Sequence, residues 1–193
     1  MTVRHIRLFL ILLIGIVISS CTKQKDIDIS KYPIITTVKE LTEFYDVSLD
    51  STRKYENSSI TMYFDGSSDL EYTYELLETE KYDPLFYNIT IDLEPTEKDA
   101  ILTYEVIKGA LHIGSSLSGQ GTIEIDSLDF GGDQSYYAIR TVDGDPNGII
   151  FMIRKGKNIY TLVLSGLNFS DHSIISDLVL PRIKNLETFK LID

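Results

Sequence analysis

Cysteine is nearly missing from this chain, since Cys21 is the one cysteine among 193 residues. A chain with a single cysteine cannot close an internal disulfide, so cross-links do not stabilise its fold. Stability must come from a hydrophobic core instead. Twelve tyrosines, eight phenylalanines and many isoleucines and leucines supply side chains for that core.

Basic residues are scarce, with 18 Lys and Arg against 29 Asp and Glu and no basic cluster. Because such a surface repels phosphate backbones, nucleic acid is not an expected partner. Several enzyme motifs are missing as well. The sequence has no Gly-x-Ser-x-Gly around Ser115, Ser116 and Ser118, no phosphate-binding Gly-Lys-Ser and no dinucleotide fingerprint. We therefore expect no cofactor.

The apolar run from Leu8 to Ile18 has 11 residues, whereas a membrane-spanning helix needs about 20. Arg4 and Arg7 precede the run, and the polar segment Thr22–Asp26 follows it. A charged start, a short apolar run and a small-residue end are typical of a secretory signal peptide. We expect residues 1–20 to be removed from the mature protein.

The end of this leader, Ile18-Ser19-Ser20-Cys21, resembles the lipobox of bacterial lipoproteins. By that resemblance, the lipoprotein-processing machinery attaches a diacylglyceryl group to Cys21, which becomes the new N-terminus and is N-acylated in many species. An ordinary cleaved signal would give no reason for a cysteine here. Two or more acyl chains hold a protein stably on a bilayer. The expected location is the bacterial cell envelope, on a membrane facing the periplasm or the exterior.

Without residues 1–20 and their Arg4 and Arg7, 173 residues remain, with 16 basic against 29 acidic side chains and a net charge of −13. Residues 21–33 are polar and lack a period, which predicts a lipidated N-terminus and a flexible tether from membrane to domain. Residues 34–193 have the size of one domain.

Helical and strand periods both occur within this domain. Helical spacing predicts helices near Thr37–Asp46, from Thr96 to about Gly114, and after a cap at Asp171, with Pro181 kinking or restarting the last one. Strands are expected at Ser59–Phe64, Leu70–Leu77, Leu85–Leu93, Thr122–Leu128, Ser135–Val142, Gly148–Arg154 and Asn158–Leu164. Their short connections require antiparallel neighbours. The expected fold class is α+β, with a mostly antiparallel sheet of about six to seven strands flanked by two main helices.

The order of these elements resembles the PsbP/Mog1-like fold. The residues that carry the likeness are Ser135-Tyr136-Tyr137 through Gly148-Ile149-Ile150, then Gly156–Ser165 and Ile183–Phe189. The resemblance implies a non-catalytic binding or assembly module, without naming a partner.

One segment resembles a metal-binding loop. Asp143, Asp145 and Asn147, followed by Gly148, match the start of an EF-hand calcium loop. The twelfth position, where a bidentate acid is required, is Arg154, and the flanks are expected strands. The alternative is a hairpin turn set by Asp, Asn and Gly.

Other polar residues form weaker patterns. His112 and His172 are not spaced as metal ligands, and acid pairs such as Glu78 with Glu80, or Asp126 with Asp129, are expected by chance among 29 acids. Alternating tyrosines favour a core position beneath helices over a recognition surface. These tyrosines are Tyr72, Tyr74, Tyr136, Tyr137 and Tyr160.

Three functional hypotheses follow. The first is a non-enzymatic envelope lipoprotein that binds another envelope protein or assists assembly. The second is a lipoprotein that binds a small ligand in a pocket between sheet and helices, or calcium at Asp143, Asp145 and Asn147. The third, a hydrolase, would require His112 or His172 beside a carboxylate and a serine.

Overall fold

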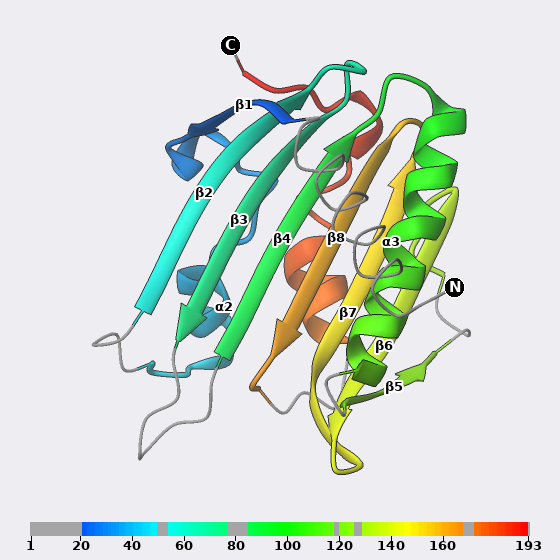
Figure 1. The fold of residues 1–193 in the computed structure, drawn as a ribbon. Helices are drawn as coiled ribbons and strands as arrows, with labels where there is room; N and C mark the ends of the chain where they lie inside the picture. The colour runs from blue at the N-terminus through cyan, green and yellow to red at the C-terminus, as the bar shows by residue number, and fades with distance from the viewer. Residues whose placement is uncertain are drawn as a thin grey trace, which may run out of the picture.

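The computed structural model describes residues 21–49, 54–76, 85–117, 120–125, 129–167 and 172–192. These residues form an α+β domain around one antiparallel sheet of eight strands (Figure 1). In chain order the strands are β1 (Cys21–Asp26), β2 (Lys54–Tyr63), β3 (Ser68–Leu76), β4 (Leu85–Leu93), β5 (Gln120–Glu124), β6 (Gln134–Val142), β7 (Asp145–Lys155) and β8 (Asn158–Ser165). The α+β class and the antiparallel sheet are confirmed, whereas the expected count of six to seven strands is too low.

Two meanders of four strands, β1–β4 and β5–β8, meet where β4 pairs with β8. The strand order is β1-β2-β3-β4-β8-β7-β6-β5, and every neighbouring pair is antiparallel. The long helix α3 (Glu97–Leu117) carries the chain from the middle of the sheet to its far edge (Figure 1). The two edges of the sheet are therefore β1 and β5.

The sheet has two faces with separate hydrophobic clusters. The back face carries α2 (Val38–Tyr45) and the π-helical turn η3 (Ile174–Val179), and it holds the larger cluster. Its strand residues include Leu70, Tyr72, Tyr74, Tyr87, Ile89, Ile91, Tyr160 and Leu162. The front face carries α3, whose Ala100 and Tyr104 belong to the smaller cluster with Ile150. Strands β7 and β8 are buried on both faces.

All five tyrosines that the alternation places in the core are buried, which confirms that prediction. Their neighbour Tyr87 is buried too, and its hydroxyl donates to the backbone oxygen of Thr36 at 2.8 Å. The hydroxyl of Tyr72 accepts from the backbone N–H of Val38 at 3.1 Å. These bonds position the start of α2 on the back face, because a buried hydroxyl left without a partner would be costly.

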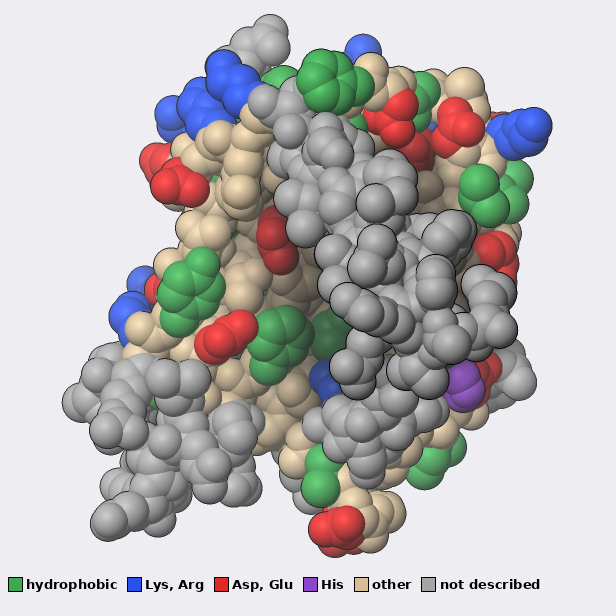
Figure 2. Space-filling view, in the orientation of Figure 1, with side chains coloured by type: hydrophobic (Ala, Val, Ile, Leu, Met, Phe, Trp, Pro, Cys, Tyr) green, Lys and Arg blue, Asp and Glu red, His purple; other side chains and the backbone are tan. Residues whose placement is uncertain are grey.

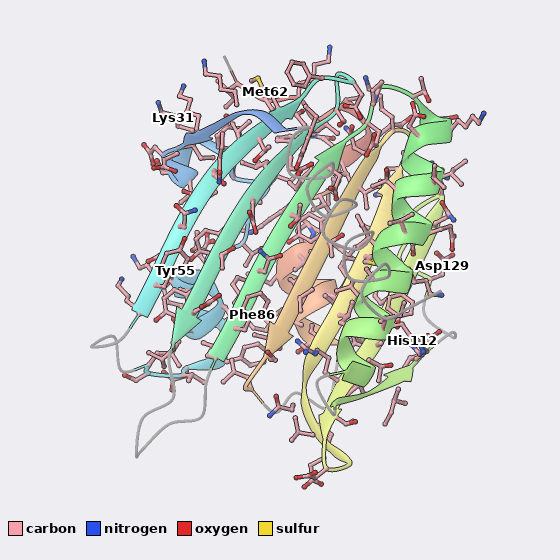
Figure 3. The ribbon with its side chains drawn as sticks, in the orientation of Figure 1. Lys31, Tyr55, Met62, Phe86, His112 and Asp129 are labelled. Atoms are coloured by element: carbon pink, nitrogen blue, oxygen red, sulfur yellow. The ribbon has the colours of Figure 1, made fainter. Side chains whose placement is uncertain are left out.

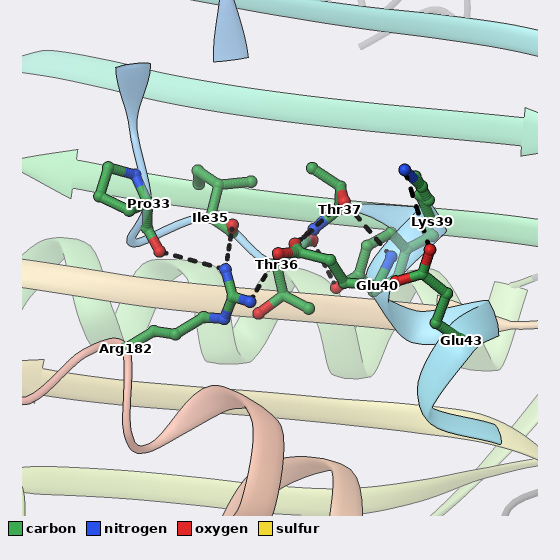
Figure 4. Close-up of polar contacts among 9 residues, drawn as sticks. Pro33, Ile35, Thr36, Thr37, Lys39, Glu40, Glu43 and Arg182 are labelled. Atoms are coloured by element: carbon green, nitrogen blue, oxygen red, sulfur yellow. Dashed lines mark hydrogen bonds and ion pairs between the residues drawn. The ribbon is translucent and has the colours of Figure 1, made fainter. Parts of the chain in front are cut away.

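On the back face, Arg182 connects the C-terminal part of the chain with the segment that leads into α2 (Figure 4). Its guanidinium donates to the backbone oxygens of Pro33 and Ile35, both at 3.3 Å, and to Glu40 Oε1 at 2.6 Å. Glu40 also forms the capping box of α2 with Thr37. Partial burial opposes ionisation of Glu40, but hydrogen bonds from Thr37 and Arg182 prevail and lower its pKa.

The helix capped by Thr96 is confirmed but is longer than expected. Thr96 Oγ1 accepts from the Asp99 N–H at 3.2 Å, and α3 then runs for 21 residues to Leu117 instead of ending at about Gly114. The glycines at 109 and 114 do not end it. Its packing against the sheet outweighs their low helix propensity.

The polar segment after Cys21 is a strand, so its interpretation as a flexible tether is wrong for these residues. β1 pairs with β2 from Cys21 to Asp26, and a short 3-10 turn (Ile29–Lys31) leads to the buried Tyr32. An edge strand can be held by backbone hydrogen bonds to its one neighbour without alternating apolar residues. The polar composition of residues 21–26 therefore did not indicate a strand. Residues 1–20, the expected signal peptide, lie outside the described residues.

The last helix also differs from its prediction. η3 closes as a π-helix, with the Leu180 N–H donating to the Ile175 oxygen at 2.8 Å. The chain does not resume a regular helix after Pro181 but reaches a 3-10 turn at Leu186–Thr188. Because proline has no N–H to donate, it cannot continue the ladder. The cap expected at Asp171 lies outside the described residues.

Candidate functional site

The front face of β2, β3 and β4 is the candidate site, called the open face below. α3 lies over the β5–β7 half of the sheet, and within the described ranges no helix lies over β2–β4 on this side (Figure 1). Since side chains alternate along a strand, the residues out of phase with those that pack on the back face point to this face. They are Tyr55, Asn57, Ser59 and Thr61 of β2, Asp69, Glu71, Thr73 and Glu75 of β3, and Phe86, Asn88, Thr90 and Asp92 of β4.

Hydrogen bonds between side chains connect β3 and β4 across the middle of the open face. Asn88 Nδ2 donates to Glu71 Oε1 and to Thr73 Oγ1, both at 2.9 Å. Thr90 Oγ1 donates to Asn88 Oδ1 at 3.2 Å. These contacts fix the polar groups before any ligand arrives, which reduces the entropy lost on binding.

Tyr55 and Phe86 bring aromatic surface to the lower part of the open face (Figure 3). Tyr55 is 53% exposed, although most tyrosines of this chain lie in the core. Glu75 pairs with Tyr55 across the two strands and with Phe86 on the other side. The aromatic side chains are of the type enriched in protein interfaces, and Glu75 adds one carboxylate between them.

Two carboxyl groups face each other at the upper end of the open face. Asp69 of β3 and Asp92 of β4 are cross-strand partners, and Tyr63 Oη donates to Asp69 Oδ2 at 2.6 Å. Burial, followed by the charges of Asp69 and Glu94, raises the pKa of Asp92 well above its usual value. Burial also raises the pKa of Asp69, and two facing carboxylates cannot both ionise cheaply, so the pair holds a proton more readily than isolated carboxyl groups, with the larger rise at Asp92.

A hollow of about 380 Å³ lies where the open face meets α3. Asn88 and Ser165 line it from the sheet, Leu111 from the helix, and Arg140 from β6. Burial lowers the pKa of the Arg140 guanidinium, which nevertheless stays charged at any ordinary pH. The hollow therefore combines apolar walls with one cation.

Asp143, Asp145 and Asn147 lie in the β6–β7 hairpin, outside the open face. Val142 pairs with Asp145, so Asp143 and Gly144 form a two-residue turn with φ of 53° and 90°. Asp-Gly is favoured there because both positions need positive φ. Asn147 Oδ1 accepts from the Gly166 N–H at 2.9 Å. In the described part of the chain, no three His, Cys, Asp or Glu residues are grouped to hold a metal.

Within the described ranges, the two candidate hydrolase histidines lie on opposite faces of the sheet. His112 lies on α3, which covers the front face (Figure 3), whereas His172 precedes η3, whose Ile174 and Ile175 pack in the back-face cluster. Glu78, Glu80, Asp126 and Ser118 lie outside the described residues, and Asp129 is exposed in a loop. Cys21 is the first described residue, at the start of β1.

Sequence reasoning missed the open face, although its signal was present. Residues 68–76 and 85–93 alternate, and the outward phase of both is polar. The alternation does not show which strands pair with β4. Asp69 faces Asp92 only because the register of β3 against β4 puts them opposite each other.

No protein-family model, curated protein or solved structure matches the chain. None of the described helices is both long and apolar enough to span a membrane.

Proposed function

We propose that this chain is a bacterial envelope lipoprotein whose folded domain is a non-enzymatic protein-binding or assembly module. Acyl chains on Cys21, the last residue of the lipobox Ile18-Ser19-Ser20-Cys21, hold it on a membrane that faces the periplasm or the exterior. The likeness to the PsbP/Mog1-like fold belongs to this proposal and favours binding over catalysis. The observation that carries the proposal is the open face.

The open face has the properties of a recognition surface. Its polar groups are ordered by mutual hydrogen bonds, and its aromatic rings lie beside Glu75. Asp69, Glu71 and Glu75 give β3 a row of carboxyl groups on this side. Charge complementarity therefore favours a partner that presents basic side chains.

A charge reversal on the open face tests this proposal. Glu75→Lys places a cation between Tyr55 and Phe86, and we expect it to abolish recovery of crosslinked partners from detergent-solubilised envelopes. Glu97→Lys changes the charge equally in the exposed first turn of α3 and serves as the matched control. Crosslinking that is the same for wild type and both variants would contradict binding at the open face.

A second candidate function is small-ligand binding, the alternative that a pocket between sheet and helix favours. Arg140 in the 380 Å³ hollow fits a small anion such as a carboxylate, because a guanidinium binds such groups in a bidentate manner. Arg140→Gln should remove any stabilisation of the fold that a panel of small carboxylates produces. A panel that shifts no melting temperature argues against this candidate. Calorimetry with calcium tests the separate cation hypothesis at Asp143, Asp145 and Asn147.

A further inference from the structure

We propose that one corner of the domain lies directly against an anionic phospholipid bilayer. This surface, called the lysine corner, consists of Lys23, Lys25, Lys31, Met62, Phe64 and Ile192. The inference rests on the lipid anchor of the proposed function and adds the orientation that the anchored domain takes.

Because β1 begins at Cys21, no flexible linker separates the proposed site of lipid attachment from the folded domain. Cys21 pairs with Tyr63, so their Cα atoms are about 5 Å apart, and Phe64 follows directly after β2. An unstructured segment over residues 21–33 would allow a separation of up to about 40 Å. With β1 paired, acyl chains on residue 21 bring the lysine corner to the membrane surface.

The apolar members of the lysine corner are unusually exposed. Phe64 is 80% exposed, Ile192 56% and Met62 50%. Met62 and Ile192 border one shallow hollow together with Lys23 and Lys25. Figure 3 shows Met62 at the end of the sheet where the C-terminus also lies. Side chains like these are stabilised when they enter the boundary between headgroups and acyl chains.

The lysines gather positive charge at this corner of an acidic chain. Lys23 and Lys25 project from the same side of β1, and Lys31 follows within the adjoining 3-10 turn. The view in Figure 2 shows basic side chains gathered at this corner. Among the residues that the structure describes, none of the three lysines forms an ion pair.

Acidic neighbours are also present, and they keep their charge. Asp26 and Asp28 line the same hollow as Lys25 and Lys31. Asp28 accepts from the N–H and hydroxyl of Ser30, and Asp65 accepts from those of Ser67. Because the three lysines offset these carboxylates, the lysine corner is less negative than the rest of this acidic chain, so an anionic bilayer repels it least and selects one orientation.

Tryptophan fluorescence tests the orientation, because the chain contains no tryptophan of its own. The chain from Cys21 onward contains every residue that the structure describes. Its single cysteine allows a maleimide lipid to be coupled to residue 21 and inserted into vesicles of phosphatidylcholine and phosphatidylglycerol. Phe64→Trp places a reporter at the lysine corner. Tyr55→Trp, nine residues earlier and about 30 Å away along β2, is the matched control.

Brominated lipids should quench the indole of Phe64→Trp several-fold more strongly than that of Tyr55→Trp. In the Phe64→Trp background, Lys23→Glu with Lys25→Glu should abolish that difference. Lys39→Glu with Lys54→Glu alters net charge equally on exposed side chains elsewhere and should preserve it.

Two results would overturn the proposal. One is equal quenching of the reporters at positions 55 and 64. The other is quenching at position 64 that the Lys23 and Lys25 reversals leave unchanged. Melting curves confirm that each variant is folded.

This experiment separates the two proposals, since the lipid is attached chemically. Failure at the vesicle surface would reject the lysine corner and leave lipidation in cells unaffected. Metabolic labelling of the full chain with palmitate tests lipidation directly. Absence of label on Cys21 would reject the anchor whatever the vesicles show.

Discussion

Asp92 is the residue whose surroundings depart most from what a carboxylate prefers. It is 8% exposed, it faces Asp69, and its Oδ2 has no hydrogen-bond partner in the described part of the chain. Like charges directly opposite each other on neighbouring strands destabilise a sheet. A retained proton relieves this repulsion, which makes the upper end of the open face sensitive to pH.

Asp92→Asn should stabilise the fold at neutral pH. The raised pKa of Asp92 means that folding binds a proton, so its contribution is fully present below the unfolded pKa of about 4 and is lost as pH rises through the folded pKa. Asparagine can donate to Asp69 at every pH. We expect a gain on the order of 1–3 kcal/mol at pH 7 that shrinks towards pH 4, measured by urea unfolding.

The exposed Asp145→Asn variant is the control for this prediction and should track the wild type. A difference between wild type and Asp92→Asn that stays constant from about pH 4 to pH 7 would show that Asp92 carries no retained proton.

At the scale of elements, local periodicity predicted the bounds of an element where its side chains alternate between a buried and a polar face. β4 begins and ends where its alternation predicted, and α2 follows its capping box. β1 has no such pattern, since its polar residues are held by pairing with β2 alone. The pairing of β4 with β8 and the facing of Asp69 and Asp92 depend on contacts between distant segments. No local pattern contains that information.

The β6–β7 hairpin offers a matched pair of glycines for testing the register of the sheet. Gly148 has φ +142°, and a Cβ there would lie 2.0 Å from the Leu164 oxygen in β8. Gly144 has φ +90° with nothing within 4 Å of the same atom. Both positions have a positive φ that strains any residue other than glycine. Only at Gly148 does the backbone of β8 also approach closely.

Gly144→Ala should therefore cost about 1–3 kcal/mol from backbone strain alone, whereas Gly148→Ala should cost clearly more or prevent folding. Thermal unfolding followed by circular dichroism measures both. Similar losses for the two variants would mean that β7 and β8 are not packed as closely as described.

At the scale of the whole molecule, we expect the proposed attachment at Cys21 and the folding of the domain to be separable. Cys21 is the terminal residue of β1, and its pairing with Tyr63 uses the backbone, which any residue supplies. The core is made of strands and helices from Tyr32 onward. The side chain at position 21 should therefore matter for location and not for stability.

Cys21→Ser should move the protein from the membrane pellet to the soluble fraction. It should change the free energy of unfolding by less than about 0.5 kcal/mol, the effect of a typical surface substitution. Thr22→Ser is the control and should stay in the pellet. If Cys21→Ser loses its folded structure along with its attachment, the separation between anchor and domain is wrong.

The direct entry of the chain into β1 also decides how a partner would meet this protein. With residue 21 at a bilayer, β2, β3 and β4 run away from that surface for about 30 Å, so the open face stands upright and looks sideways. A binding surface held in this way diffuses only within the plane of the membrane. It meets neighbours embedded in the same leaflet far more often than molecules that arrive from above.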